Sequence, residues 1–164
     1  MKKGRSNAIV LVMLLGMVVS VSGRASEIGQ QNSSGSPKAT ADTDAIKQTA
    51  LDYIEGWYEG NAERMERALH PELAKRIVRT DPKTGRSRLD QMSALSLVQG
   101  TRAHSGKPVP KEKQQKDVTI LDVFEGAASV KVVAADWIDY LQMSRFNGRW
   151  VIVNVLWELK PETK

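Results

Sequence analysis

The fold of this chain is decided by the stretch NGRWVIVNVLWEL, residues 147–159. An Asn-Gly pair between two apolar runs is the strongest short signal of a β-hairpin, so we expect one strand before the pair and another after it. Alternation along the second strand groups Val151, Val153, Val155 and Trp157 on one face and Trp150, Ile152, Asn154 and Leu156 on the other. Both faces are largely apolar, although a sheet in a small monomer usually leaves one face in water. The second face must therefore meet a helix layer, a ligand cavity or another subunit.

Further strands are predicted upstream of this stretch. Strand-like runs cover residues 118–124, 127–137, 138–146 and 150–159, and Glu125-Gly126 separates the first two. The turn residues at 81–85 separate two shorter runs, 73–79 and 86–92, which predicts one more hairpin.

Helices are predicted before these strands. In DAIKQTALDYIEGWYEG, residues 44–60, apolar side chains recur at the spacing of one helical face, with Thr43 or Asp42 as the N-cap and Gly60 at the end. Asn61 and Ser93 are the expected N-caps of two shorter helices, and the polar residues 103–116 are expected to form a loop. Helices followed by an antiparallel meander predict an α+β fold, with N-terminal helices packed on the sheet.

The N-terminal segment has the pattern of a secretory signal peptide. A basic start is followed by an apolar run over residues 8–21 and by small residues at Ser22, Gly23 and Ala25. A membrane span needs about 20 apolar residues, so an uncleaved anchor is the less favoured alternative. We expect a signal peptide at 1–25, a flexible polar leader at 26–42 and a folded domain at 43–160. A periplasmic or secreted protein without a stable membrane anchor would result.

Charge and cysteine content exclude several classes of function. Four of the 24 basic residues precede residue 26, so 20 basic and 19 acidic residues remain after cleavage. The lysine-rich loop at 107–116 contains no aromatic residue, which argues against nucleic-acid binding. The absence of cysteine excludes disulfides, thiolate metal sites and a thiol nucleophile. The only histidines, His70 and His104, have no ligand-like spacing, so neither a metal site nor a cofactor is expected.

Four stretches resemble the nuclear transport factor 2-like superfamily, and within it the family labelled "putative lumazine-binding". They are AIKQTALDYIEGWYEGNAERM (45–65), LHPEL (69–73), DWIDYL (136–141) and GRWVIVNVLW (148–157). The resemblance implies a cone-shaped, cystatin-like fold, in which a strongly curved antiparallel sheet wraps around helices and encloses an apolar cavity. It also implies that dimerisation through the sheet is common. The superfamily includes isomerases, dehydratases, cyclases and non-catalytic binders, so the fold alone does not identify an activity.

Asp136, Asp139 and Tyr140 form the best candidate catalytic cluster. If the strand face that Asp136 closes lined the cavity, desolvation would raise the pKa of this carboxyl group towards that of a useful base. Tyr140 could then donate a hydrogen bond to a developing oxyanion. The alternative is that both aspartates lie at a strand bend in water, as acidic residues usually do.

Aromatic residues are the candidate ligand-binding groups. The four tryptophans, Trp57, Trp137, Trp150 and Trp157, could line an aromatic pocket. The candidate ligand-binding residues are Tyr53, Trp57, Trp137, Trp150 and Asn154. The alternative is plain core packing, which is the commoner use of aromatic stripes.

Two functional hypotheses follow from these residues. The favoured one is an exported, non-catalytic domain that binds a small apolar molecule in its cavity, forms a homodimer through the sheet, or does both. The alternative is a cofactor-free isomerase or hydratase that uses Asp136 or Asp139 with Tyr140. For the dimer, we expect either Trp150, Ile152 and Leu156 or Val151, Val153 and Val155 at the interface.

Overall fold

The computed structural model describes residues 37–106 and 108–161. The predicted signal peptide and the first part of the predicted leader lie outside these residues. Helix α1 spans Pro37–Glu59, so its start lies before the predicted caps at Asp42 and Thr43, and the end of the predicted leader is helical. A proline at the first helical position is pre-organised for the helix. This start signal was overlooked because the residues around Pro37 are polar and resemble a flexible leader. The helix ends at Gly60, whose φ of 66° suits glycine.

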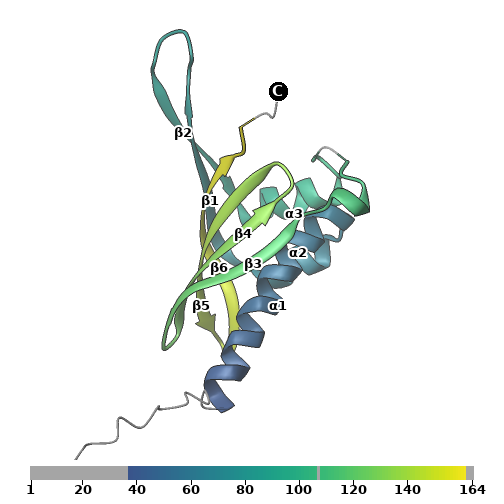
Figure 1. Ribbon diagram of the computed structural model, residues 1–164, viewed down its shortest axis with the longest axis vertical. Coiled ribbons are helices and arrows are strands. Elements are labelled where there is room, and N and C mark those ends of the chain that lie inside the picture. Colours follow the sequence, from purple (N-terminus) through teal and green to yellow (C-terminus); the bar gives the residue numbers. More distant parts are fainter. Residues whose placement is uncertain (1–36, 107, 162–164) are drawn as a thin grey trace, which may run out of the picture. The chain divides into compact units, whose positions relative to one another are not determined.

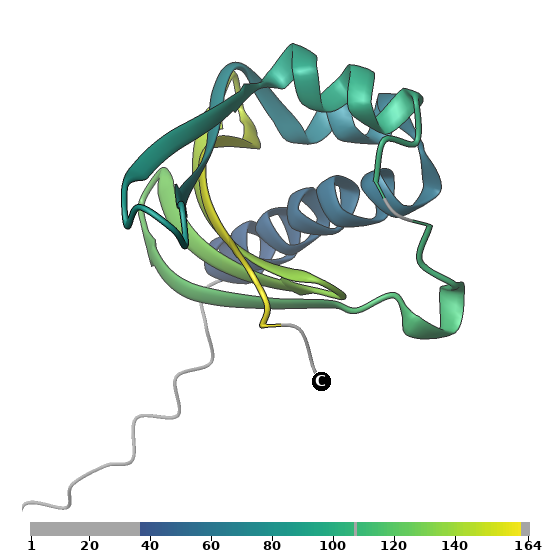
Figure 2. The same cartoon turned by 90° about the horizontal axis from the view of Figure 1, so that it is seen from above.

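The two shorter helices begin at the predicted caps. In α2 (Ala62–Ala68) the Asn61 side chain accepts a hydrogen bond from the Arg64 N–H at 3.0 Å. In α3 (Ala94–Arg102) the Ser93 hydroxyl accepts one from the Ser96 N–H at 3.2 Å. The three helices lie together on the concave side of the sheet (Figure 2).

Six strands form one sheet in the order β2-β1-β6-β5-β4-β3. They are β1 (Leu69–Thr80), β2 (Ser87–Ser93), β3 (Lys116–Phe124), β4 (Ala127–Ala134), β5 (Trp137–Phe146) and β6 (Arg149–Leu159). The β1–β2 hairpin extends beyond the other strands (Figure 1). The α+β class is confirmed, with two differences in detail. β1 pairs with β6 in parallel, and a bend at residues 135–136 separates β4 from β5 where one run to 137 was expected.

A β-bulge in β6 changes which residues share a face. Gln142 pairs with Asn154 but Met143 pairs with Ile152, so Val153 is an extra residue on β6. Beyond the bulge the alternation is shifted by one position. Ile152 and Val155 therefore both face the core, whereas Leu156 is exposed on the outer face. The two predicted interface sets are wrong, because each mixes residues from both faces.

The core lies between the concave face of the sheet and the helices. Its fully buried side chains come from α1, α2 and the central strands: Ile46, Ile54, Met65, Val130, Val132, Leu141, Met143 and Ile152. This packing fills the layer near the β5–β6 turn and leaves it hollow at the opposite end of the same strands.

Candidate functional site

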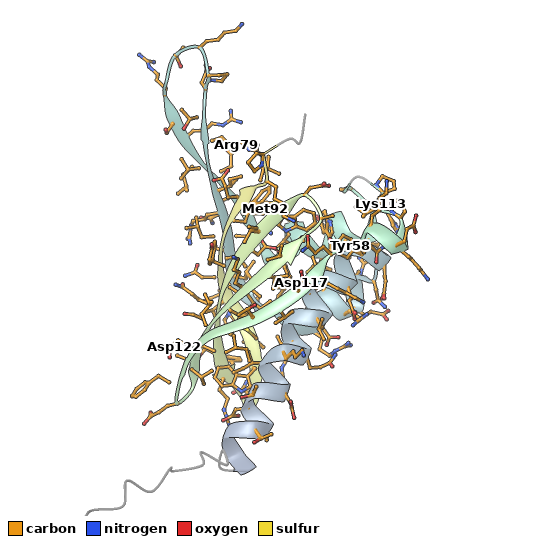
Figure 3. All side chains as sticks on the ribbon, viewed as in Figure 1. Tyr58, Arg79, Met92, Lys113, Asp117 and Asp122 are labelled. Atoms are coloured by element: carbon orange, nitrogen blue, oxygen red, sulfur yellow. The ribbon has the colours of Figure 1, made fainter. Side chains whose placement is uncertain are left out.

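A cavity of about 1080 Å³ occupies the hollow end of the layer between the helices and the sheet. This volume lies just above the usual range for small-molecule sites, about 300–1,000 Å³. Arg79 on β1 and Met92 on β2 belong to one wall and are labelled in Figure 3. The other walls come from α1, from α3 with the segment after it, and from the ends of β5 and β6.

Aromatic side chains form much of the cavity wall. Tyr53 and Trp57 come from α1, Trp137 from the start of β5 and Trp157 from the end of β6. The rings of Trp57 and Trp137 meet edge to face, with centroids 6.4 Å apart and planes at 84°. Such an arrangement fixes the orientation of both indoles. Trp57 is only half-buried, because the cavity takes the place of protein on one side of its ring.

A buried ion pair lies at the floor of the cavity. Lys75 on β1 and Asp139 on β5 are 4% and 0% exposed, and the Lys75 Nζ contacts Oδ1 of Asp139. The Tyr53 hydroxyl accepts a hydrogen bond from Lys75 Nζ at 2.5 Å and donates one to Asp139 Oδ2 at 3.1 Å. The Trp137 indole N–H donates to the same Oδ2 at 2.7 Å. The carboxylate thus has three donors, which offsets much of the cost of burying its charge.

Burial controls the protonation of this cluster. Desolvation lowers the pKa of Lys75, while the charge of Asp139 and its hydrogen bond oppose that shift. Burial raises the pKa of Tyr53 well above 10.0, and the Asp139 charge raises it further. Tyr53 therefore stays neutral, and its hydroxyl can accept from Lys75 and donate to Asp139 at the same time.

The ammonium group of Lys75 also lies against three aromatic rings. Its Nζ is 4.8 Å from the ring centroid of Trp157, 5.3 Å from that of Tyr53 and 5.9 Å from that of Trp137. Aromatic rings attract cations at these distances. The protein therefore carries its own cation inside its aromatic cage.

A short segment after α3 covers Trp57. A Cβ on Gly106 would lie 2.9 Å from the Trp57 indole, so only glycine allows this approach. The same segment is positioned by His104, whose ring lies over Gly60; a Cβ there would be 2.0 Å from His104 Nε2. Two glycines thus let the segment close this side of the cavity.

The predicted ligand-binding residues divide into two groups. Tyr53, Trp57 and Trp137 line the cavity. Trp150 instead belongs to the solid core near the β5–β6 turn, and Asn154 lies in a groove on the outer face of the sheet. The bulge at Val153 is the physical reason for the position of Asn154.

The predicted catalytic cluster is not assembled. Asp136 is exposed at the bend on the cavity rim, and Asp139 lies behind the lining with its oxygens occupied. Tyr140 is 46% exposed on the outer face of β5. Adjacent residues of a strand point to opposite faces, so Asp139 and Tyr140 cannot act on one substrate. The structure brings Asp139 together with Tyr53 and Lys75 instead.

Sequence reasoning missed Lys75 as a site residue. The signal was present in the alternation of Leu73, Lys75 and Ile77, in which a lysine lies between two apolar residues of one strand face. All three are buried. Trp157, one of the tryptophans expected in an aromatic pocket, does line the cavity, and it follows Val155 on the same face.

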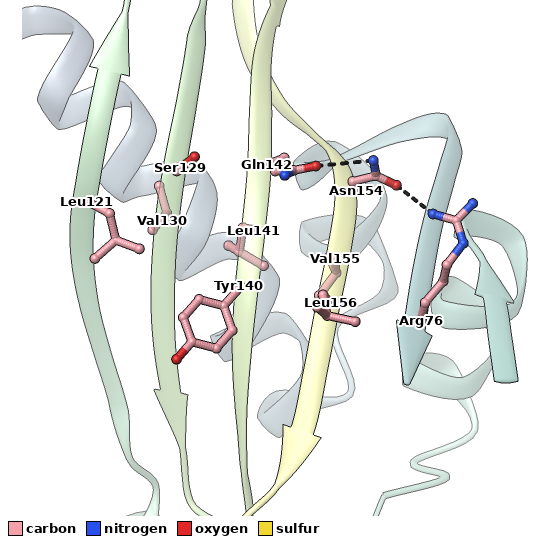
Figure 4. Close-up of a pocket in the computed structure, with 10 residues that line it drawn as sticks. All are labelled: Arg76, Leu121, Ser129, Val130, Tyr140, Leu141, Gln142, Asn154, Val155 and Leu156. Atoms are coloured by element: carbon pink, nitrogen blue, oxygen red, sulfur yellow. Dashed lines mark hydrogen bonds between the residues drawn. The ribbon is translucent and has the colours of Figure 1, made fainter. Parts of the chain in front are cut away.

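The outer face carries a second, smaller groove of about 320 Å³. Leu121, Tyr140 and Leu156 give it apolar character (Figure 4). Its polar edge is a chain of hydrogen bonds in which Arg76 donates to Asn154 Oδ1 at 2.9 Å and Asn154 donates to Gln142 Oε1 at 3.2 Å. This groove shares no lining residue with the cavity.

The described part of the chain has neither a metal-ligand cluster nor a membrane-spanning helix. No group of three histidine, aspartate or glutamate side chains there could hold a metal ion. No helix in the same part of the chain is long and apolar enough to cross a membrane.

Comparisons with known proteins agree with this architecture. A family model described as "Putative lumazine-binding" matches residues 41–158. A nuclear transport factor 2-like protein of unknown function from Shewanella baltica OS155 is 18% identical, with a TM-score of 0.60 over 75% of this chain and 97% of that chain. One from Methylobacillus flagellatus KT is 20% identical, with a TM-score of 0.59 over 74% and 94%.

A protein of unknown function with a cystatin-like fold from Nostoc punctiforme PCC 73102 is 15% identical, with a TM-score of 0.53 over 74% of this chain and 92% of that chain. At these identities the likeness shows the fold alone. No curated protein matches the chain.

Proposed function

This chain belongs to the family described as "Putative lumazine-binding", of the nuclear transport factor 2-like superfamily, and we propose that it binds a small, flat, largely apolar molecule in its inner cavity. The observation that carries the proposal is the tryptophan-walled cavity of about 1080 Å³ above a buried ion pair. Flat rings stack well on indoles, and a cavity of this size accommodates two or three fused rings. The family description points to the same class, since lumazine is a flat two-ring molecule.

Binding is favoured over catalysis by the state of the acidic groups. Asp139 accepts from three donors and does not line the cavity, so it is not free to take a proton from a substrate. Asp136 is exposed on the rim, on the opposite side of the sheet from Tyr140. A general base and its partner acid must both reach one substrate, and Asp136 and Tyr140 line different hollows on opposite faces of the sheet.

A fluorescence titration tests the proposal. Naphthalene and lumazine are added separately to the purified domain, and tryptophan emission is followed. We expect saturable quenching in the wild type, weakened at least tenfold in Trp137→Leu, which removes one cavity wall. Trp150→Phe is the matched control, because that ring lies in the solid core, and it should leave both affinities unchanged. If neither probe quenches the emission saturably, the proposal is contradicted.

The outer face supports a second candidate function, assembly into a homodimer. Leu121 is 53% and Leu156 56% exposed beside Tyr140, and a twofold contact through this face would cover all three. Leu156→Asp should convert a wild-type dimer into a folded monomer in light scattering. Wild-type protein that remains monomeric at high concentration would exclude this function.

We also propose that the protein is exported. The support is the sequence pattern of residues 1–25, which lies outside the described residues. N-terminal sequencing of the protein from an exported fraction should find a start between about residues 23 and 27. A membrane-bound chain that still begins at Met1 would contradict export.

A further inference from the structure

The polar groups at the cavity floor indicate which chemical class of ligand the cavity takes. Lys75 Nζ has three N–H donors, of which Asp139 and Tyr53 accept two. The third has no acceptor among residues 37–106 and 108–161, although Lys75 is part of the cavity lining. Buried donors almost always find an acceptor, so this one is available to a molecule in the cavity.

A second donor in the same wall is also unsatisfied. The indole N–H of Trp157 is buried and has no hydrogen-bond partner within the described part of the chain. The Trp157 ring centroid is 4.8 Å from Lys75 Nζ, so the two unsatisfied donors belong to one patch of wall. This patch has donors to spare and no free acceptor, because the Asp139 oxygens lie behind the lining.

The charges around the cavity point in the same direction. Arg79 lies over the Trp157 ring at 5.8 Å and pairs with Asp90 at 3.1 Å. Lys160 at the rim bonds to the oxygens of Gln115 and Ala134 and to no carboxylate in the described residues.

The acidic residues of the lining are Asp90, which pairs with Arg79, and Asp136, which is exposed to water. At the cavity floor a cationic ligand would meet the Lys75 ammonium, whose counter-ion Asp139 lies behind the lining. The floor therefore presents a spare N–H donor and no carboxylate to a cavity occupant, which favours an electron-rich oxygen over a cation.

We propose that the ligand is a flat ring that carries a carboxylate or conjugated carbonyl oxygen, and that this oxygen accepts a hydrogen bond from Lys75 Nζ while the ring stacks on the tryptophans. This inference rests on the proposed function and adds a polar anchor to it. A charge-assisted hydrogen bond in a desolvated site is strong enough to determine ligand choice. Lys75 is thus the specificity-determining residue of the cavity.

Four naphthalene probes of one ring size test the inference on the intact domain. They are naphthalene, 2-naphthamide, 2-naphthoate and the 2-naphthyltrimethylammonium cation. We expect the amide and the carboxylate to bind at least tenfold more tightly than naphthalene, and the cation at least tenfold more weakly. Infrared spectra of wild-type protein with 2-naphthamide should show the bound carbonyl stretch at lower wavenumber than in water-free solvent.

Two variants locate the effect. Lys75→Met combined with Asp139→Asn removes both charges together, so that neither is left buried alone, and it should abolish the preference for the oxygen-bearing probes. Lys131→Met is the matched control, because Lys131 alternates with the buried Val130 and Val132 and points away from the cavity; it should keep the preference. Circular dichroism checks that both variants fold. If the double variant does not fold, the infrared shift of the probe bound to the wild type still tests the proposed hydrogen bond.

The outcomes separate the two proposals. If neither naphthalene nor lumazine binds, the proposed function is wrong. If naphthalene binds and the oxygen-bearing probes gain less than twofold, only the inference about Lys75 is overturned. A preference that persists in the folded double variant, or an unshifted carbonyl stretch in the wild type, would also overturn it.

Discussion

Tryptophan is used in opposite ways at the two ends of the layer between helices and sheet. Near the β5–β6 turn, Trp150 is 4% exposed, and its indole N–H donates to Asp42 at 3.2 Å. At the other end of the same strands, Trp57, Trp137 and Trp157 surround a cavity. The solid end has apolar neighbours for its indole, whereas the hollow end has an ion pair and three rings that do not fill the space. One end contributes stability, and the other leaves room for an occupant.

The buried ion pair is the strongest test of this contrast, because it lies at the floor of the hollow end. Lys75→Met alone would leave the Asp139 carboxylate buried without a cation. Loss of one partner of a buried pair costs about 3–5 kcal/mol, so we expect the free energy of unfolding to fall by about that amount. Urea denaturation measures it.

The double variant Lys75→Met with Asp139→Asn is the control for that prediction. It leaves no unpaired charge and should recover most of the lost stability. A single variant that loses less than about 1 kcal/mol would mean that water reaches the pair and that the cavity floor is open.

Truncating one tryptophan at each end compares the ends directly. Trp150→Ala should destabilise the domain by about 3–5 kcal/mol, as expected for a packed core aromatic. Trp57→Ala should cost less, about 1–2 kcal/mol, because part of its ring already faces the cavity and loses no contacts. Both values come from chemical denaturation of the folded variants. Equal losses would contradict the division into a solid and a hollow end.

Local patterns predicted much of this fold. The Asn147-Gly148 turn and the caps at Asn61 and Ser93 depend on residues adjacent in the chain, and all three lie where the sequence places them. The parallel contact between β1 and β6 and the bulge at Val153 depend on strands distant in sequence. Register between such strands is set by tertiary packing, which periodicity within one strand does not contain.

The candidate site was partly predictable for the same reason. Tyr53 and Trp57 follow from the stripe of α1, whereas Asn154 was assigned to the wrong face because of the bulge. The proposed use of Asp139 with Tyr140 conflicts with strand alternation itself and was avoidable. Lys75 was overlooked because lysine is rarely buried, and only its partner Asp139, 64 residues away, makes burial tolerable.

The segment that covers the hollow end offers a finer test. Gly60→Ala places a Cβ against the His104 ring at a residue with φ of 66°. We expect a loss of about 1–2 kcal/mol and a red shift of tryptophan emission, as the segment over Trp57 lifts and admits water. Gly85→Ala is the matched control, because Gly85 has a similar φ of 69° but open space around it. It should show a smaller loss of stability and no shift of tryptophan emission. A shift in both variants would mean that the emission change does not report on the segment over Trp57.

The smallest expected effect concerns the charge cluster on α1 and α2, in which the buried Asp52 pairs with Arg64 and with the exposed Arg67. Burial raises the pKa of Asp52, but hydrogen bonds from Arg67 and Arg64 outweigh it, and the net pKa lies below 3.8. A hydrogen bond from Lys116 lowers the pKa of Glu55 below 4.5, with help from Arg64 and against burial. Each carboxylate has a lower pKa folded than unfolded. Its contribution to the free energy of unfolding is therefore fully present above the pKa of the unfolded state. That contribution is lost as the pH falls through the pKa of the folded state.

Urea midpoints measured from pH 6 down to pH 3 should reveal this loss. We expect the free energy of unfolding to start falling near pH 5, with Asp52 contributing about 1 kcal/mol or less, since its partner Arg67 is exposed and water screens that ion pair. Asp52→Asn should be less stable than wild type at pH 6 and should show a shallower fall on acidification, so that the two curves converge towards pH 3. Glu63→Gln is the control, because Glu63 is exposed on α2 and makes no ion pair among the described residues. If the pH curves of wild type and Asp52→Asn run parallel, the arginines of α2 do not stabilise the contact between α1 and α2. That contact would then depend on apolar packing alone.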